Sequence, residues 1–241
     1  MELIPIRTRV LHPPKDNLID VLNSSLIDVT NGDVVIITSK VVAIHEGRCV
    51  PIRGTDKEKL ILKEAESVLY PSWRKIPITI TNNAVISSSG IDESNGEGHY
   101  ILLPKDSFES ARILRKHLME RHHVSTLGVV ITDSHSLPFR YGAMSIAIGC
   151  WGFEPVLSYI GRTDLFGRVM QYSKTNLPDS IAAAATLVTG ECDESQPIAI
   201  ARGIPNLVWS EADPRPSFFI PYEDDIYRDL YRDFRNPNTQ V

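Results

Sequence analysis

Three acidic stretches of this sequence each follow an apolar segment. Asp133 and Ser134 come directly after the run LGVVIT, and Asp92 lies in the glycine-flanked loop SSSGIDESNGEG. Glu191 lies in the loop TGECDESQP, after an alanine-rich segment. Carboxylate and hydroxyl oxygens are the hard ligands that Mg²⁺ and Mn²⁺ prefer. Each stretch alone is compatible with a solvated turn, but carboxylates that gather at one place repel one another, so the three together favour a divalent-metal site.

A second set of polar residues suits an anionic ligand. Ser39 and Lys40 follow the apolar run DVVIIT, and a hydroxyl and an ammonium group can bind and neutralise phosphate. A solvated, isolated lysine is the commoner alternative. His135 lies in the same suspect stretch as Asp133 and is a candidate substrate contact. The sequence has no GxxxxGK[ST], GxGxxG, GxSxG or HExxH motif, so the standard nucleotide cradles and two common hydrolase sites are excluded.

The elements that must position these side chains follow from hydrophobic periodicity. We expect strands at 2–6, 33–39, 127–132, 143–152 and 196–203, and a hairpin at 78–87. We expect helices at 16–26, 56–70, 107–123 and 179–190. Ser107 would cap the start of the third, and Gly190 would end the fourth. The order lacks a regular strand–helix–strand rhythm. It therefore predicts an α+β fold with mixed, largely antiparallel sheets and packed helices.

Composition narrows the class of protein. The 241 residues carry a net charge of −5, so no extended nucleic-acid surface is expected. No apolar leader and no run of about 18 apolar residues occurs, which argues against a membrane protein. Cys49, Cys150 and Cys192 form no CxxC pair, which favours free thiols and a cytoplasmic protein. We expect one domain over 1–210 and a C-terminal extension or interaction arm at 211–241, with a polar helix at 223–235 as one form of it.

Long blocks of the chain match known motifs in order and spacing. GDVVIITSKVVAIHEGR resembles GDVxVVTSKxVSKAEGR, SSGIDESN resembles NAGIDxSN, and LLPKD resembles LLPxD. VVITDSHSLPFRYGAMSIAIG is similar to VIISDTFGRPWRxGxxxxAIG, IGRTDLFGR to GRxDxFGR, and DSIAAAATLVTGE to DEIAAAAxLxMGE, followed by PxxxxRG. These motifs belong to the coenzyme F420-0:γ-glutamyl ligases, which the chain resembles over roughly residues 5–205.

The resemblance implies a fold, a reaction and an assembly. It implies an α+β homodimer that uses GTP and Mg²⁺ or Mn²⁺, with K⁺ as an additional ion. A carboxylate of a small-molecule acceptor would attack the γ-phosphate of GTP. The amino group of L-glutamate would then capture the acyl phosphate and form an amide. Neither nucleic acid nor a membrane is an expected partner.

The resemblance also assigns roles to residues of this chain. The implied metal ligands are Asp92, Asp133, Ser134 and Glu191. Asp92, Asp133 and Lys40 are the implied catalytic residues. The implied nucleotide contacts are Arg9, Val10, Leu11, His12, Ser39, Lys40, Asn95, Thr189, Gly190, Glu191 and Cys192. Candidate contacts to the anionic acceptor or to glutamate are His135, Arg140, Arg162 and Arg168; for the three arginines, ion pairs at a dimer interface are an equal alternative.

Three departures from the family pattern bear on the substrate. Ile44 and His45 stand in SKVVAIHEGR where the family usually has a lysine, and SSGID replaces NAGID. The substrate-side FGRPWR loop reads HSLPFR. We therefore keep a folate-like acceptor as an alternative to coenzyme F420-0. These departures also leave open a metal-dependent nucleotide phosphohydrolase and a non-catalytic nucleotide-binding protein.

Overall fold

A five-stranded sheet forms the centre of the computed structural model, which describes residues 1–70 and 76–237. Its strand order is β1-β12-β2-β8-β9, and every neighbouring pair is antiparallel except the parallel pair β2–β8. The strands are β1 (Glu2–Ile6), β2 (Asp33–Thr38), β8 (Leu127–Ser136), β9 (Ala143–Trp151) and β12 (Ile198–Arg202). The predicted α+β class, with mostly antiparallel sheets, is confirmed.

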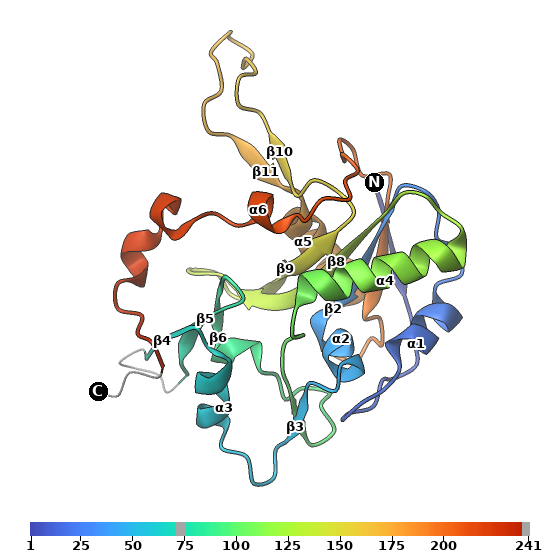
Figure 1. Ribbon diagram of the computed structural model, residues 1–241, viewed down its shortest axis with the longest axis vertical. Coiled ribbons are helices and arrows are strands. Elements are labelled where there is room, and N and C mark those ends of the chain that lie inside the picture. Colours follow the sequence, from blue (N-terminus) through green and yellow to red (C-terminus); the bar gives the residue numbers. More distant parts are fainter. Residues whose placement is uncertain (71–75, 238–241) are drawn as a thin grey trace.

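Helices cover both faces of this sheet (Figure 1). On one face, α1, α2 and α4 pack against side chains such as Val35 and Ile37 of β2. On the other, α5 packs against Val34 and Ile36. Because β2 is buried on both sides, its sequence is a continuous apolar run rather than an alternating one. The helices are α1 (Leu18–Ser25), α2 (Ser39–His45), α3 (Lys57–Glu64), α4 (Ser107–His122), α5 (Leu177–Thr189) and α6 (Arg215–Phe218).

Three small sheets surround the central one. They have the orders β3-β7, β4-β5-β6 and β10-β11. The hairpin predicted at 78–87 is confirmed as β5 and β6, and its turn residues Asn82 and Asn83 have φ of 52° and 57°. These strands are β3 (Cys49–Pro51), β4 (Ser67–Leu69), β5 (Ile78–Thr81), β6 (Ala84–Ser87), β7 (His99–Ile101), β10 (Val156–Ser158) and β11 (Lys174–Asn176).

Strand β8 is longer than its sequence predicts. The expected end at 132 is wrong, because β8 continues to Ser136 after an irregularity between Ile131 and Thr132. Asp133 pairs with Ile146 of β9, and its successors continue the ladder. A ladder needs only backbone partners, which β9 supplies, so polar side chains do not end it. Asp133 and Ser134 therefore project from a rigid two-stranded ribbon.

Other element ends also differ from expectation. The helix predicted at 56–70 ends at Glu64, because the chain turns there to pair β4 with β5. Helix α4 is capped by Asp106 rather than Ser107; the Asp106 carboxylate accepts the backbone N–H groups of Phe108 and Glu109. Instead of a polar helix, the predicted stretch 223–235 contains short 3₁₀ turns. The 3₁₀ turns of the chain are η1 (Ser88–Gly90), η2 (Tyr222–Asp224) and η3 (Arg228–Tyr231).

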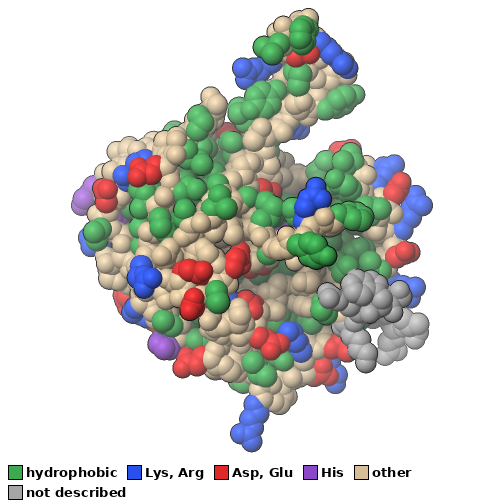
Figure 2. All heavy atoms as spheres, turned by 180° about the vertical axis from the view of Figure 1, so that it is seen from behind, with side chains coloured by type: hydrophobic (Ala, Val, Ile, Leu, Met, Phe, Trp, Pro, Cys, Tyr) green, Lys and Arg blue, Asp and Glu red, His purple; other side chains and the backbone are tan. Residues whose placement is uncertain are grey.

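Residues 159–173, which we call the arm, project far from the body between β10 and β11 (Figures 1 and 2). Leu165 and Phe166 at the arm are 98% and 95% exposed. The motif GRTDLFGR lies in this arm. The Met170 N–H donates to the Arg162 carbonyl at 2.8 Å and the Gly161 N–H donates to the Met170 carbonyl at 2.9 Å, so the arm is an ordered hairpin loop.

All three cysteines are free, as the sequence predicts. Within 1–70 and 76–237, no helix combines the length and the apolar character needed to cross a bilayer. The division into 1–210 and 211–241 stays a prediction. Residues 211–219 pack against α4: Phe218 and Phe219 contact the Phe108 ring edge-on at centroid distances of 5.8 and 5.5 Å.

Candidate active site

A cleft of about 2040 Å³ opens at the end of the central sheet where β2 stops and the ribbon of β8 begins. We call one side of it the polar wall. Residues from four separate segments make up this wall: Ser39, Lys40, Asp92, Asp133, Ser134 and Glu191. The sequence-predicted catalytic and metal-ligating residues thus meet at one cleft, although they are far apart along the chain.

The parallel pairing of β2 with β8 brings Ser39 and Asp133 together. Thr38 is in register with Thr132, so Ser39, which opens α2, and Asp133, which continues β8, lie side by side at the end of β2. The Ser39 hydroxyl donates a hydrogen bond of 2.7 Å to Asp133 Oδ1. Ser39 opens helix α2 rather than ending the preceding strand, and it is buried.

The pKa of Asp133 is far from its ordinary value. Burial raises it to about 7, the Ser39 hydrogen bond opposes that rise, and the charges of Asp92 and Glu191 add to it. Lys40 acts in the opposite direction. A carboxyl group in this position is readily protonated near neutral pH, and a bound cation would favour its charged form.

Lys40 is paired with Asp92 and does not stand as an isolated surface lysine. Its Nζ lies 2.7 Å from Asp92 Oδ2 and donates to both the backbone and side-chain oxygens of Ser94, at 2.8 Å each. Burial alone would raise the pKa of Asp92, but Lys40 and Ser94 hold it below its ordinary value. Asp92 is therefore an anion already matched to a cation.

Glu191 completes the polar wall from the loop after α5. The Ser134 hydroxyl donates to Glu191 Oε2 at 2.6 Å. The Asn95 amide donates to the backbone oxygen of Cys192 at 2.8 Å, so the two acidic loops are tied together. Gly190 has φ of 74° and ψ of −174°, a backbone conformation that is essentially confined to glycine.

The donor set suits a hard divalent cation in its chemistry. Asp92, Asp133 and Glu191 offer carboxylate oxygens, and burial plus mutual repulsion keeps the Asp133 pKa raised. In the described part of the chain, however, no three His, Cys, Asp or Glu side chains lie close enough to form a metal site. The acids are instead engaged with Lys40 and Ser134 in this arrangement. The residues match the ion in kind, and their side chains would have to turn toward it.

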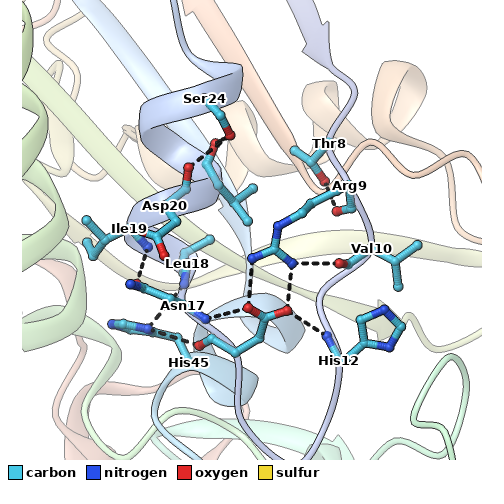
Figure 3. A network of polar contacts seen from close by, with 12 residues as sticks. Thr8, Arg9, Val10, His12, Asn17, Leu18, Ile19, Asp20, Ser24 and His45 are labelled. Atoms are coloured by element: carbon cyan, nitrogen blue, oxygen red, sulfur yellow. Dashed lines mark hydrogen bonds and ion pairs between the residues drawn. The ribbon is translucent and has the colours of Figure 1, made fainter.

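The segment that precedes α1 forms another border of the cleft. Thr8, Arg9, Val10 and Leu11 line it, whereas His12 does not and instead contacts Glu97 at 3.0 Å. The Arg9 guanidinium makes two bonds of 2.6 and 2.7 Å to the Asp16 carboxylate, as the network in Figure 3 shows. Arg9 holds the Asp16 pKa well below its usual range. Arg9 is thus a paired cation that fixes the course of this segment.

The proposed substrate residues separate into two groups. His135 and Arg140 line the cleft, and the loop between them carries Phe139 with φ of 59°. Burial lowers the pKa of His135, while the charge of Asp179 opposes that shift. Arg162 and Arg168 lie on the arm and do not line the cleft. The remaining nucleotide-contact candidates, Thr189, Gly190 and Cys192, do line it.

One part of the cleft is not predicted by the sequence. Four residues of the C-terminal segment, Tyr227, Leu230, Tyr231 and Phe234, line it; we call them the aromatic wall. Their spacing of three and four residues is the only local signal, and it fits one face of the expected polar helix equally well. Nothing local to the sequence indicates that they return to the cleft.

The comparisons with known proteins give the family of the chain. Hard oxygen donors beside a lysine, at the edge of an α+β sheet, suit a phosphate-bearing ligand. A family model described as F420-0:gamma-glutamyl ligase matches residues 5–203, and the chain belongs to this family. The polar wall lies inside the matched region and the aromatic wall outside it.

Several curated relatives bear the name coenzyme F420:L-glutamate ligase, and three of them are compared with the chain. The chain is 40% identical to the one from Methanopyrus kandleri over 61% of this chain and 58% of the relative. It is 35% identical to the one from Methanocaldococcus jannaschii over 70% and 67%. It is 34% identical to the one from Natronomonas pharaonis over 77% and 71%. The matches thus span 58% to 71% of these relatives' length.

Proposed function

We propose that this protein is a GTP-dependent ligase that joins L-glutamate, through an amide bond, to a carboxylate of a coenzyme F420-0-type acceptor. Membership of the F420-0:gamma-glutamyl ligase family supports the reaction class. The names of the relatives support the acceptor and the amino acid. The observation that carries the proposal is the polar wall, in which Lys40 and three carboxylates from separate segments face one cleft.

The chemistry proceeds in two displacements. An acceptor carboxylate oxygen attacks the γ-phosphate of GTP, and GDP leaves. The amino group of L-glutamate then attacks the acyl carbon, phosphate leaves, and the nitrogen loses a proton. Both steps bring anions together, so the protein must neutralise charge and align the reacting groups.

Lys40 would place positive charge beside the phosphates, and Ser39 would orient Asp133 through their 2.7 Å hydrogen bond. The Asn95 bond to Cys192 would keep the two acidic loops in register around the nucleotide. Mg²⁺ or Mn²⁺, with K⁺ as an additional ion, would be held by the metal ligands Asp92, Asp133, Ser134 and Glu191 and would offset repulsion between acceptor and phosphates.

We also propose a homodimer in which the arm contacts a second copy. Large apolar side chains on a projecting loop indicate an interaction surface, and Leu165 and Phe166 are almost fully exposed. Arg162 and Arg168 would then bind anionic groups across that interface. Free cysteines agree with a reducing compartment, so we place the protein in the cytoplasm.

The test is a reconstituted reaction analysed by mass. The protein is incubated with GTP, Mg²⁺ or Mn²⁺, L-glutamate and coenzyme F420-0, with folic acid in a parallel reaction. We expect one acceptor to gain glutamyl residues in proportion to GDP formed. Phosphate release that does not depend on acceptor or glutamate would identify a phosphohydrolase instead. GTP binding without turnover under any metal would identify a non-catalytic nucleotide-binding protein.

A further inference from the structure

The C-terminal segment is fastened at both ends of its path past the cleft. At its start, Arg215 donates to both carboxylate oxygens of Asp106 at 2.8 Å. At its end, the Val68 N–H donates to the Arg235 carbonyl at 2.8 Å, and the Arg235 N–H donates back at 2.9 Å. Figure 1 shows this segment passing from α6 to β4. We call residues 215–235 the strap; its course is fixed by these two attachments.

The strap has its own internal order. The ring of Tyr231 lies 6.2 Å from that of Tyr222 and 6.1 Å from that of Phe234. The Tyr231 hydroxyl donates to the Asp225 carboxylate at 3.2 Å. These contacts order Tyr231 and Phe234 before any ligand arrives, which lowers the entropic cost of binding one.

The strap residues that line the cleft are all uncharged. The aromatic wall contains two tyrosines, a leucine and a phenylalanine, and none of its four members is charged. Charged neighbours such as Arg228 and Arg232 are exposed and do not line the cleft. The strap extends the β4-β5-β6 sheet, whose Leu69, Ile78 and Val85 also line the cleft. This surface suits the face of a flat ring, and it carries no cation to pair with a phosphate or carboxylate.

We propose that the aromatic wall binds the planar aromatic ring of the acceptor, with Tyr227 and Leu230 as specificity-determining residues; this rests on the proposed ligase function. The reacting carboxylate of the acceptor would then reach toward the polar wall. The guanine base of GTP is the rival occupant, since it is also planar. The residues that the resemblance implies for GTP all lie within the matched region. The aromatic wall lies outside that region and contains none of them, which leaves it for the acceptor.

Tyr227 is the residue to change. Its side chain is 56% exposed, so its removal should leave the fold intact. Ile226 is the matched control, because it is 85% exposed, adjacent in sequence and absent from the cleft lining. The full chain is titrated with coenzyme F420-0, and separately with folic acid, by calorimetry in the absence of nucleotide. The same proteins are titrated with GTP.

We expect Tyr227→Ala to weaken binding of the ring-bearing probe by about 2- to 12-fold, the range of one aromatic contact. Tyr227→Phe should bind like the parent and Ile226→Ala should be unchanged. The double variant Tyr227→Ala/Leu230→Ala should bind more weakly than either single one. GTP affinity should stay the same in all of them, and thermal unfolding should confirm that each is folded.

Three results would overturn the assignment: equal affinity of Tyr227→Ala and parent for the ring-bearing probe, a loss confined to GTP, or no binding of either probe by the parent. The proposed function fails in a different way. The parent protein could bind the probe through Tyr227 and yet add no glutamate in the presence of GTP and metal. That result would support the ring-binding role of the aromatic wall and reject the ligase function. Glutamate transfer to the acceptor at the same rate and KM in Tyr227→Ala and the parent would support the ligase function and reject the role of the aromatic wall.

Discussion

The polar wall and the aromatic wall face the same cleft but are built in different ways. The polar wall is made by residues at the end of the central sheet and in the loops beside it, and polar contacts of 2.6 to 2.7 Å connect its members in pairs. The aromatic wall comes from a strap that is fastened at its ends and has short 3₁₀ turns between them.

This difference corresponds to a division of labour. Phosphate chemistry needs charges at fixed positions, and a buried sheet with its loops tied together provides them. Recognition of a particular acceptor can be altered by changing a surface strap, because such a change leaves the core packing untouched. Changes to the polar wall should therefore abolish chemistry, and changes to the aromatic side should alter preference.

The largest effect is expected from Asp133→Asn. Turnover should fall by roughly 100- to 1000-fold, because the substitution removes a charge that the cation and phosphates require. GDP formation and acceptor mass are the measurements. Glu97→Gln is a control, since Glu97 is an exposed acid outside the cleft lining. If Asp133→Asn no longer folds, by thermal unfolding, the role of Asp133 is structural.

Lys40→Met should weaken GTP binding by about 10- to 100-fold, the range of a charge-assisted hydrogen bond. Lys57→Met is the matched control, because Lys57 also lines the cleft and pairs with Glu93. Titration with GTP in the presence of Mg²⁺ separates the two. Equal losses in both variants would mean that the polar wall attracts nucleotide only by its general charge.

Phe139→Gly tests the rewritten loop beside the cleft. Phe139 has φ of 59° and a 99% exposed side chain, so glycine should relieve backbone strain and raise stability by up to about 1 kcal/mol. The KM for the acceptor should rise by about 2- to 12-fold while that for GTP stays constant. Tyr141→Ala, an exposed aromatic outside the cleft lining, should change neither. A rise in the GTP KM alone would assign this loop to the nucleotide.

The smallest effect concerns stability and pH. Burial raises the Asp133 pKa from 3.8 to about 7, so the folded protein holds this proton more tightly than the unfolded chain does. The resulting contribution to the free energy of unfolding is fully present below pH 3.8 and is lost as the pH rises through about 7. Relative to Asp133→Asn, the parent should lose on the order of 1 kcal/mol between pH 5 and 8, about 2–4 °C in Tm. Added Mg²⁺ should restore part of it at pH 8. Parallel melting curves for both proteins across this range would contradict the raised pKa.

Much of the fold could be predicted because its signals are local. The apolar run of β2, the Asn82-Asn83 turn and the amphipathic helix α4 each carry their pattern within one short segment. The predicted ends of elements are wrong where pairing with a strand distant in sequence decides them. β8 continues past 132 because β9 pairs with it, and the helix after Asp56 stops at Glu64 because β4 must pair with β5.

The candidate site divides in the same manner. Family motifs pointed to Lys40, Asp92, Asp133 and Glu191 one by one, and these do line one cleft. Arg162 and Arg168, the two candidate substrate contacts on the arm, do not line that cleft, and their role stays a prediction. No periodicity in a loop tells how far it projects, because a loop makes few contacts within its own length.

The sequence by itself determined the chemical types available to this protein: buried apolar strands, three acidic loops, and a lysine after a strand. These follow from side-chain polarity and spacing, which are local properties. The tertiary structure alone decided that Ser39 bonds Asp133, that Lys40 pairs with Asp92, and that a C-terminal strap supplies an aromatic wall. Such contacts join residues about 50 to 170 positions apart, from Lys40–Asp92 to Val68–Arg235, and only packing of the whole chain brings them within bonding distance.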